Sequence, residues 1–399
     1  MKIMYLSFNE PLKGLGVYKK ELSLCKTLYF AALNKGHSFR GVNVVIDNNN
    51  KLFMDKHYEV ISYSKLKFLS KIPIIRSLAN YLIKKYIAFK EIKKYNPDIL
   101  IFRYIWLPFV FNPKKVKKDM LFLTEHQTKE EYELSVSLLK KLTLKPIESF
   151  NFKKLFKSID GIIGVTKEIA EYEIKRGKVS KPTFVLTNGI DVEQYPPKKF
   201  VKFNDRLNII FVTAFYSSWH GFDRILYGLK KFYDNGNSLD IFIYVVGDVK
   251  SGYENMALNL NLKERIIFCG TKYNKELNQI FDICHIGLGP LAIHRKNLEY
   301  ASPIKVREYL ARGMPVIIGY KDEDIEDDFP FVLKVSSDDS PVDIQNVVDF
   351  CKNIYDNYGE KMIYEIRNYA KNKLDYSVKI TKLVDFLEKL NIKNKKKEL

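Results

Sequence analysis

The sequence predicts an α/β protein made of two doubly wound domains, each with a parallel sheet covered by helices. Short apolar runs recur along the chain and are separated by segments of helical periodicity. The runs are continuously apolar rather than alternating, which is typical of strands buried on both faces. The rhythm breaks once, at the PPKK stretch 196–199, and then resumes. We therefore expect domains at 1–195 and 206–374, a linker at 196–205, and a C-terminal helix with a basic tail at 375–399 that packs on the first domain.

In the first domain, six apolar runs are expected to form strands. They are Lys2–Ser7, Val42–Ile46, Ile99–Arg103, Met120–Leu123, Gly161–Val165 and Thr183–Leu186. A loop with Gly14 and Gly16 follows the first run, and the periodicity after it predicts a helix from about Val17 to Asn34. A turn at Asn188–Asp191 ends the set.

The same alternation of apolar runs and helical segments continues in the second domain. The expected strands are Leu207–Thr213, Asp240–Val246, Arg265–Phe268, Ile286–Gly289 and Val316–Ile318, with helices near Asp223–Asn235 and Asn274–Phe281. Two further helical stretches are expected at about 343–374 and 378–390.

The stretch from Ser302 to Ile317, SPIKVREYLARGMPVI, carries the strongest local signal. It predicts an amphipathic helix that stops at Gly313, with Glu308 in its first turn, followed by a buried strand. The N–H groups of a helix N-terminus can hold an anion, and a carboxylate there can accept hydrogen bonds from sugar hydroxyls. The segment alone leaves two interpretations open: Glu308 binds a ligand, or it complements the helix dipole.

The composition limits the class of protein. With 399 residues and 46% hydrophobic residues, the chain can build two cores. No apolar run reaches the ~18 residues that span a bilayer, and the N-terminus shows no signal-peptide pattern. The four cysteines, at positions 25, 269, 284 and 351, lack metal-like spacing, so we expect a cytoplasmic protein without a metal site.

The net charge of +19 suggests an anionic binding partner or a structural reason for the excess of lysines and arginines. No nucleic-acid-binding motif accompanies the lysines, so nucleic acid is not expected as a partner. Many of the lysines fit solvated helix faces, and an anionic membrane surface is the partner that remains for the others.

Four motifs, in this order along the chain, resemble those of the GT-B glycosyltransferases, specifically glycosyltransferase family 4 (glycosyl transferases group 1). KGLGVYKKELSL resembles the family's Gly-rich loop, and VLTNGIDVEQYPP resembles the turn that ends its first domain. WHGFDRIL stands where the family has K-G-x-x-x-L, and SPIKVREYLARGMPVI is similar to E-A-x-A-x-G-x-P-V. The variants most resemble bacterial transferases of capsule or O-antigen polysaccharide. The resemblance implies two Rossmann-like domains that face each other across a cleft, with the acceptor on the first and the nucleotide-sugar donor on the second.

The resemblance also implies roles for particular residues. Glu308 would accept the ribose hydroxyls of the donor, and Lys305 would meet its phosphate. Gly14 and Gly16 would let the backbone approach the donor, although an ordinary strand-to-helix loop explains them as well. His126 matches the family's histidine near the sugar and is the expected catalytic residue. A lone histidine is often structural, and Glu125 or Glu130 could replace it.

The sequence departs from the family at the donor phosphates. His220 stands where lysine is usual, and the family's arginine position is not basic. Arg224, His294 and Arg295 are therefore candidates to supply charge, while surface ion pairs are the alternative explanation for both arginines. The family's partner glutamate falls at Tyr300, one position from Glu299.

The family implies transfer with retention of anomeric configuration and no obligatory metal or other cofactor, and the chain has no DxD-type cluster. The acceptor would be a saccharide or a lipid-linked saccharide. The basic, apolar segment 66–94 predicts peripheral attachment to the inner face of the cell membrane through Lys84, Lys85, Lys93 and Lys94. Packing of this segment in the first core is the alternative.

Two other functions remain open from the sequence. A GT-B relative that epimerises or hydrolyses nucleotide-sugars would release free sugar or epimer without an acceptor. A non-catalytic protein that binds a polyanion would explain the charge but not the four ordered motifs.

Overall fold

The chain folds into two compact units in the computed structural model, which describes residues 1–10, 15–46, 55–63, 73–106, 110–134, 138–178, 180–248 and 250–398. The first unit comprises Met1–Thr187 and Tyr376–Leu399, and the second comprises Asn188–Asp375. The second unit thus begins before the stretch 196–205, which lies inside it.

The first unit is built on a parallel sheet with the strand order β3-β2-β1-β4-β5-β6-β7. The strands are β1 (Lys2–Ser7), β2 (Ser38–Val45), β3 (Tyr58–Ser62), β4 (Ile99–Arg103), β5 (Leu121–His126), β6 (Gly161–Gly164) and β7 (Thr183–Val185). The helices are α1 (Leu15–Asn34), α2 (Pro73–Tyr95), α3 (Glu130–Glu133), α4 (Leu138–Phe156), α5 (Lys167–Gly177) and α12 (Tyr376–Glu398). All six predicted runs form strands here, and β3 is a strand that the sequence analysis missed.

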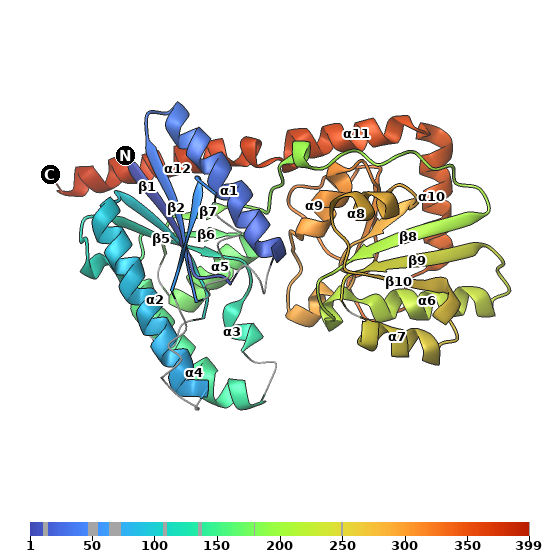
Figure 1. The fold of residues 1–399 in the computed structure, drawn as a ribbon, viewed down its shortest axis with the longest axis horizontal. Helices are drawn as coiled ribbons and strands as arrows, with labels where there is room; N and C mark the ends of the chain where they lie inside the picture. Colours follow the sequence, from blue (N-terminus) through green and yellow to red (C-terminus); the bar gives the residue numbers. More distant parts are fainter. Residues whose placement is uncertain are drawn as a thin grey trace. The chain divides into compact units, whose positions relative to one another are not determined.

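Helices cover both faces of this sheet. Ile3 and Tyr5 of β1 share a core cluster with residues of α1 and α12, which pack against each other (Figure 1). Met4 and Leu6 point to the opposite face and share a second cluster with residues of α2 and α4. The alternation along one strand therefore explains why both faces are buried. The lysine-rich end expected as a tail is helical, since α12 continues to Glu398.

The second unit has the strand order β10-β9-β8-β11-β12-β13, again all parallel. The strands are β8 (Arg206–Val212), β9 (Asp240–Val246), β10 (Ile266–Gly270), β11 (Ile286–Leu288), β12 (Val316–Ile318) and β13 (Val332–Lys334). The helices are α6 (Phe222–Asp234), α7 (Lys250–Asn259), α8 (Asn274–Phe281), α9 (Ile304–Ala311), α10 (Ile344–Tyr358), α11 (Lys361–Tyr369) and the π-helix η7 (Ala370–Leu374). β13 and α7 were not predicted.

Helix α6 shows why these residues form these elements. Its apolar residues Phe222, Ile225, Leu226, Leu229 and Phe232 recur at helical spacing, and all five are buried in the core cluster of the second unit. Gly221 precedes the helix with a φ of +67°, and a Cβ there would lie 2.8 Å from the Cβ of Leu291. Only glycine combines this backbone angle with so close an approach, so the WHG motif fixes where α6 begins.

Among the described residues, no helix has both the length and the apolar character needed to cross a bilayer.

Candidate functional site

The carboxyl ends of β8, β9, β11 and β12 meet at one edge of the second unit's sheet, because all four strands are parallel. Ligands of open α/β sheets bind at this edge. The chain runs close to itself there: the N–H of Thr213 donates to the carbonyl of Val246 at 2.9 Å. Gly247 follows with a φ of +136°, and a Cβ on it would lie only 1.7 Å from the carbonyl oxygen of Thr213. This glycine is therefore required by the backbone itself.

The start of α9 is held in place by the turn that begins the second unit. The N–H of Asn188 donates to Ser302 Oγ at 2.8 Å, and Arg307 Nε donates to the carbonyl of Asn188 at 3.1 Å. Arg307 is fully buried and also forms ion pairs with Asp322 and Asp324. Two of the motifs quoted above, more than a hundred residues apart, are thus joined directly and fix the position of the α9 N-terminus.

Lys305 lies in the first turn of α9 and is the most unusual charged residue of this edge. Its Nζ is buried and has no hydrogen-bond partner within the described part of the chain. The ammonium lies 4.5 Å from the ring centroid of Phe211, which is near the end of β8. Burial lowers the pKa of Lys305 to about 7. A buried amine without a hydrogen-bond partner in the described residues, at the positive end of a helix, is the arrangement expected of an anion-binding site, and we call it the Lys305 site.

Glu308 is placed one turn later than expected. Helix α9 begins at Ile304, so Glu308 is its fifth residue, and the first turn contains no acidic residue. The prediction of a first-turn carboxylate was wrong, and complementing the helix dipole from that turn is not its role, because the dipole acts within the first turn. Glu308 Oε1 instead accepts from Arg312 Nε at 3.1 Å, and Arg312 Nη1 also donates to Asn278 Oδ1 at 2.7 Å. Its binding of ribose stays a prediction.

His220 lies close to the Lys305 site but does not supply positive charge. The imidazole is buried, and its Nδ1 lies 3.3 Å from the hydroxyl of Tyr253. Burial, reinforced by the charges of Lys305 and Lys296, lowers the pKa of His220 to about 2. The ring is therefore neutral at physiological pH and supplies no positive charge where the family has a lysine, and its predicted part in donor binding stays a prediction.

The guanidinium of Arg224 is bonded to other residues of the second unit. Its side chain is 1% exposed and donates to the carbonyls of Leu291, Ser336 and Ser340, with Asp338 as an ion-pair partner at 3.1 Å. These bonds tie the loop after β13 to α6. Within the described residues, the Arg224 guanidinium is thus occupied by partners from its own unit. Its binding of donor phosphate stays a prediction, which these contacts do not favour.

Arg295 and His294 are held by carboxylates at the surface. Arg295 forms a two-pronged pair with Asp223, at 2.9 and 2.7 Å, and its Nε donates to Asp339 at 2.7 Å. His294 Nε2 lies 3.0 Å from the same Asp339 oxygen. The ion-pair explanation that the sequence left open for Arg295 describes what is observed. Their part in donor binding remains untested.

The glycine-rich loop of the first unit is described only in part. Gly14 lies outside the described residues. A Cβ added to Gly16 would meet nothing within 4 Å, so packing of the protein does not demand glycine there. The predicted approach of this backbone to the donor stays a prediction.

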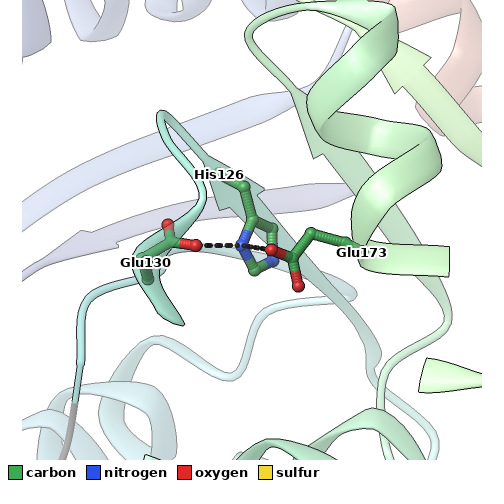
Figure 2. A group of neighbouring side chains, drawn as sticks. All are labelled: His126, Glu130 and Glu173. Carbon is green, nitrogen blue, oxygen red and sulfur yellow. Dashed lines mark hydrogen bonds and ion pairs between the residues drawn. The ribbon is translucent and has the colours of Figure 1, made fainter. Parts of the chain in front are cut away.

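His126 ends β5 and is completely buried (Figure 2). Its Nε2 lies 3.0 Å from Thr124 Oγ1, and its Nδ1 lies 3.3 Å from Glu130 and 3.8 Å from Glu173. Burial lowers the pKa of His126 despite the carboxylates around it. The catalytic role predicted for His126 stays a prediction, and a ring without exposed surface does not favour contact with a substrate.

The two alternatives named for His126 are buried as well. Glu125 accepts from the hydroxyl of Tyr5 at 2.7 Å and lies 3.9 Å from Lys20. Glu130 contacts His126 itself. All three side chains belong to the interior of the first unit at the carboxyl edge of its sheet.

Sequence reasoning missed Phe211 and Glu173. Phe211 reads as an ordinary apolar residue of β8, and only the fold shows that its ring lies under the Lys305 ammonium. Glu173 sits mid-way along α5 and looks like a solvated helix residue, yet it is fully buried. Its spacing to Ile169 and Ala170, which are also buried, is the signal that could have revealed it.

Comparison with solved structures identifies the architecture. A glycosyltransferase from Rickettsia africae has a TM-score of 0.64 at 16% identity, with 98% of each chain covered. Sucrose-phosphate synthase from Thermosynechococcus elongatus has a TM-score of 0.66 at 13% identity, covering 98% of this chain and 99% of that one. The chain has the GT-B fold.

A third GT-B structure is that of Anabaena Alr3699/HepE in complex with UDP-glucose, with a TM-score of 0.62, 12% identity, and coverage of 98% of this chain and 100% of that one. No protein-family model matches the sequence. No curated protein matches it either. At these identities the likeness establishes the GT-B fold, and the chemistry has to be argued from the residues.

Proposed function

We propose that this protein is a retaining glycosyltransferase. It would move a sugar from a nucleotide-sugar donor to a saccharide or lipid-linked saccharide, in the synthesis of a bacterial cell-surface polysaccharide. The observation that carries the donor half of this proposal is the buried, unpartnered ammonium of Lys305 at the N-terminus of α9. A UDP-glucose complex of a protein with the same fold supports a nucleotide-sugar as the ligand.

In this proposal, Lys305 and Glu308 of α9 have separate roles. The Lys305 ammonium and the backbone N–H groups at the start of α9 would stabilise the diphosphate as charge develops on the leaving group. Glu308, one turn further along, would accept the ribose hydroxyls. Because an anion favours the charged form of Lys305, binding of the donor would raise its pKa above the value of about 7 in the free protein.

Retention of configuration and the nature of the acceptor rest on the sequence resemblance. In a front-face transfer the leaving phosphate itself can take the acceptor's proton, so no side-chain base is assigned. We propose the first unit as the acceptor-binding part of the chain.

The direct test is turnover of a panel of UDP-, GDP- and CMP-sugars chosen by thermal shift, since ligands that bind only the native state raise the melting temperature. We expect nucleotide release that depends on an acceptor, a product with the donor's anomeric configuration by NMR, and loss of turnover in Glu308→Ala with the fold intact. Release of free sugar or epimer without acceptor would identify an epimerase or hydrolase instead. A Glu308→Ala variant with unchanged turnover would contradict the proposal.

We also propose peripheral attachment to an anionic membrane. The structure changes which of the predicted lysines can face the lipid. Lys84, once expected to face lipid, is buried and ion-paired with Glu10 at 2.8 Å. Lys93 and Lys94 in the last turn of α2 are exposed, as are the apolar side chains of Leu82 and Tyr86 on the same helix.

Flotation with anionic liposomes tests this attachment. The variant Lys93→Glu/Lys94→Glu should float less than the wild type, because each lysine near an anionic surface contributes about 1 kcal/mol. The matched control is Lys230→Glu, which reverses a charge on α6 of the second unit. Equal flotation of all three proteins would remove the membrane from the proposal.

A further inference from the structure

Three side chains with metal-binding atoms converge inside the first unit, where the sequence predicted no metal site. His126 ends β5, Glu130 begins α3 and Glu173 lies on α5; we call these three residues the His126 cluster. One ligand atom from each lies within 4.8 Å of the other two. In Figure 2, dashed lines join an oxygen of Glu130 and an oxygen of Glu173 to the same ring nitrogen of His126, which is Nδ1.

The imidazole is oriented as metal-binding histidines usually are. Its second nitrogen, Nε2, is 3.0 Å from Thr124 Oγ1, a polar contact that fixes the ring. The ring of Tyr104 stacks on it with centroids 4.7 Å apart. Metal-binding histidines usually have such a partner on the nitrogen that does not bind the ion. The Nδ1 atom is thereby directed at the two carboxylates.

Glu173 brings the second carboxylate to the cluster from α5. It is completely buried, and its Oε2 has no hydrogen-bond partner within the described ranges. The nearest cation is Arg176, whose Nη1 lies 3.4 Å from this oxygen and whose Nη2 is bound to Glu148 at 2.7 Å. The oxygen that faces His126 is Oε1, whereas Oε2 lies on the side of Arg176, so Glu173 offers Oε1 to the cluster while its second oxygen is paired with the guanidinium.

Burial and the neighbouring charges shift the pKa values of two residues of the cluster. Burial, aided by the charges of Glu130 and Glu148 and opposed by those of His126 and Arg176, raises the pKa of Glu173 to about 7. The same burial lowers the pKa of His126, which Glu173, Glu148 and Glu125 act to raise and Arg176 to lower.

We propose that His126, Glu130 and Glu173 bind one divalent transition-metal ion, of which Zn²⁺ is the best fit and Mn²⁺ the second. One imidazole and two carboxylates suit these ions, whose bonds to nitrogen and oxygen are about 2.0–2.2 Å long. Donor atoms 3.3 and 3.8 Å apart can close around such an ion with small side-chain movements. The ion would cross-link β5, α3 and α5 and so hold the carboxyl edge of this sheet together. This inference does not depend on the proposed transferase activity.

The test is the metal content of the full-length protein after expression in medium supplemented with Zn²⁺ or with Mn²⁺. We expect about one ion per chain in the wild type, and a loss of more than about tenfold in Glu173→Gln and in Glu130→Gln. Glu168→Gln is the matched control, since this glutamate lies on the same helix and pairs with Lys129 outside the cluster. It should keep the metal.

X-ray absorption of the loaded wild type should show nitrogen and oxygen ligands at about 2.0–2.2 Å and no sulfur. This measurement needs no variant, so the proposal can still be tested if Glu173→Gln fails to fold. A wild type with less than about a tenth of an ion per chain from either medium would overturn it. So would equal metal content in the wild type and both cluster variants.

Discussion

The Lys305 site and the His126 cluster both lie at the carboxyl edge of a parallel sheet, yet their charges are arranged in opposite ways. Lys305 is a buried cation whose Nζ has no partner within the described residues, beside a neutral histidine. The His126 cluster brings two buried carboxylates to one imidazole, with Arg176 close by. The first arrangement is suited to an anion and the second to a proton or a metal ion. The comparison indicates that one fold can present opposite charges at equivalent edges of its two sheets, and that side chains, not topology, decide the ligand.

The largest effect is expected from removing the Lys305 charge. Lys305→Met keeps the length of the side chain and should weaken binding of a nucleoside diphosphate about 10- to 150-fold, since charge-assisted hydrogen bonds contribute about 1.5–3 kcal/mol. Calorimetric titration measures this. The control is Lys230→Met, which removes a half-buried lysine of α6 that pairs with Asp234. Similar losses in both variants would show that Lys305 does not contact the nucleotide.

A smaller, more selective effect is expected at Glu308. Glu308→Gln should weaken binding of the ribose nucleotide about tenfold, because an amide is a poorer acceptor for two hydroxyls than a carboxylate. The substitution also weakens the pair with Arg312, so a second ligand is needed. A 2′,3′-dideoxy nucleotide lacks the hydroxyls and should bind wild type and variant equally. If the variant loses both ligands to the same extent, the contact with ribose is refuted.

Lys305 and Glu308 also show how much of the candidate site could be predicted from the sequence. The glutamate and lysine were found because their spacing in SPIKVREYLARGMPVI is local and the helix is short. Glu308 was predicted in the wrong turn of the helix, because nothing in the sequence shows that Pro303 caps a helix that starts only at Ile304. The strands of both sheets were predicted well where they are continuously apolar. Tyr58–Ser62 and Val332–Lys334 are partly exposed edge strands, so the apolar signal was weak there.

The charged candidates were harder to judge. Arg224 and Arg295 have the residue type expected for phosphate, and only the fold brings Asp338 and Asp223 to them. The His126 cluster needed Glu173, which is 47 positions away from His126 in the sequence and meets it only because β5 and β6 are neighbours in the sheet. Such long-range pairs have no local signature.

The smallest effect is expected in the pH dependence of stability. The folded-state pKa of Glu173 is raised, so this group favours the folded state at low pH, and that contribution is lost as pH rises through about 7. In metal-free buffer, Glu173→Gln should therefore flatten the decline in unfolding free energy between about pH 5 and pH 7, by at most about 1.4 kcal/mol per pH unit. Chemical denaturation between pH 5 and pH 8 measures it. Parallel curves for wild type and Glu173→Gln would mean that this carboxyl group does not titrate there.

The Lys305 site can be tested most directly through the protons that accompany nucleotide binding. At pH 8 most of the free protein has a neutral Lys305, because its pKa is about 7, and an anion binds better to the charged form. Calorimetry in buffers of different ionisation enthalpy should therefore show uptake of most of one proton per nucleotide, with affinity falling up to about tenfold per pH unit above pH 7. Lys305→Met should take up none. Equal proton uptake by the wild type and Lys305→Met would contradict the assignment of this lysine to the donor phosphate.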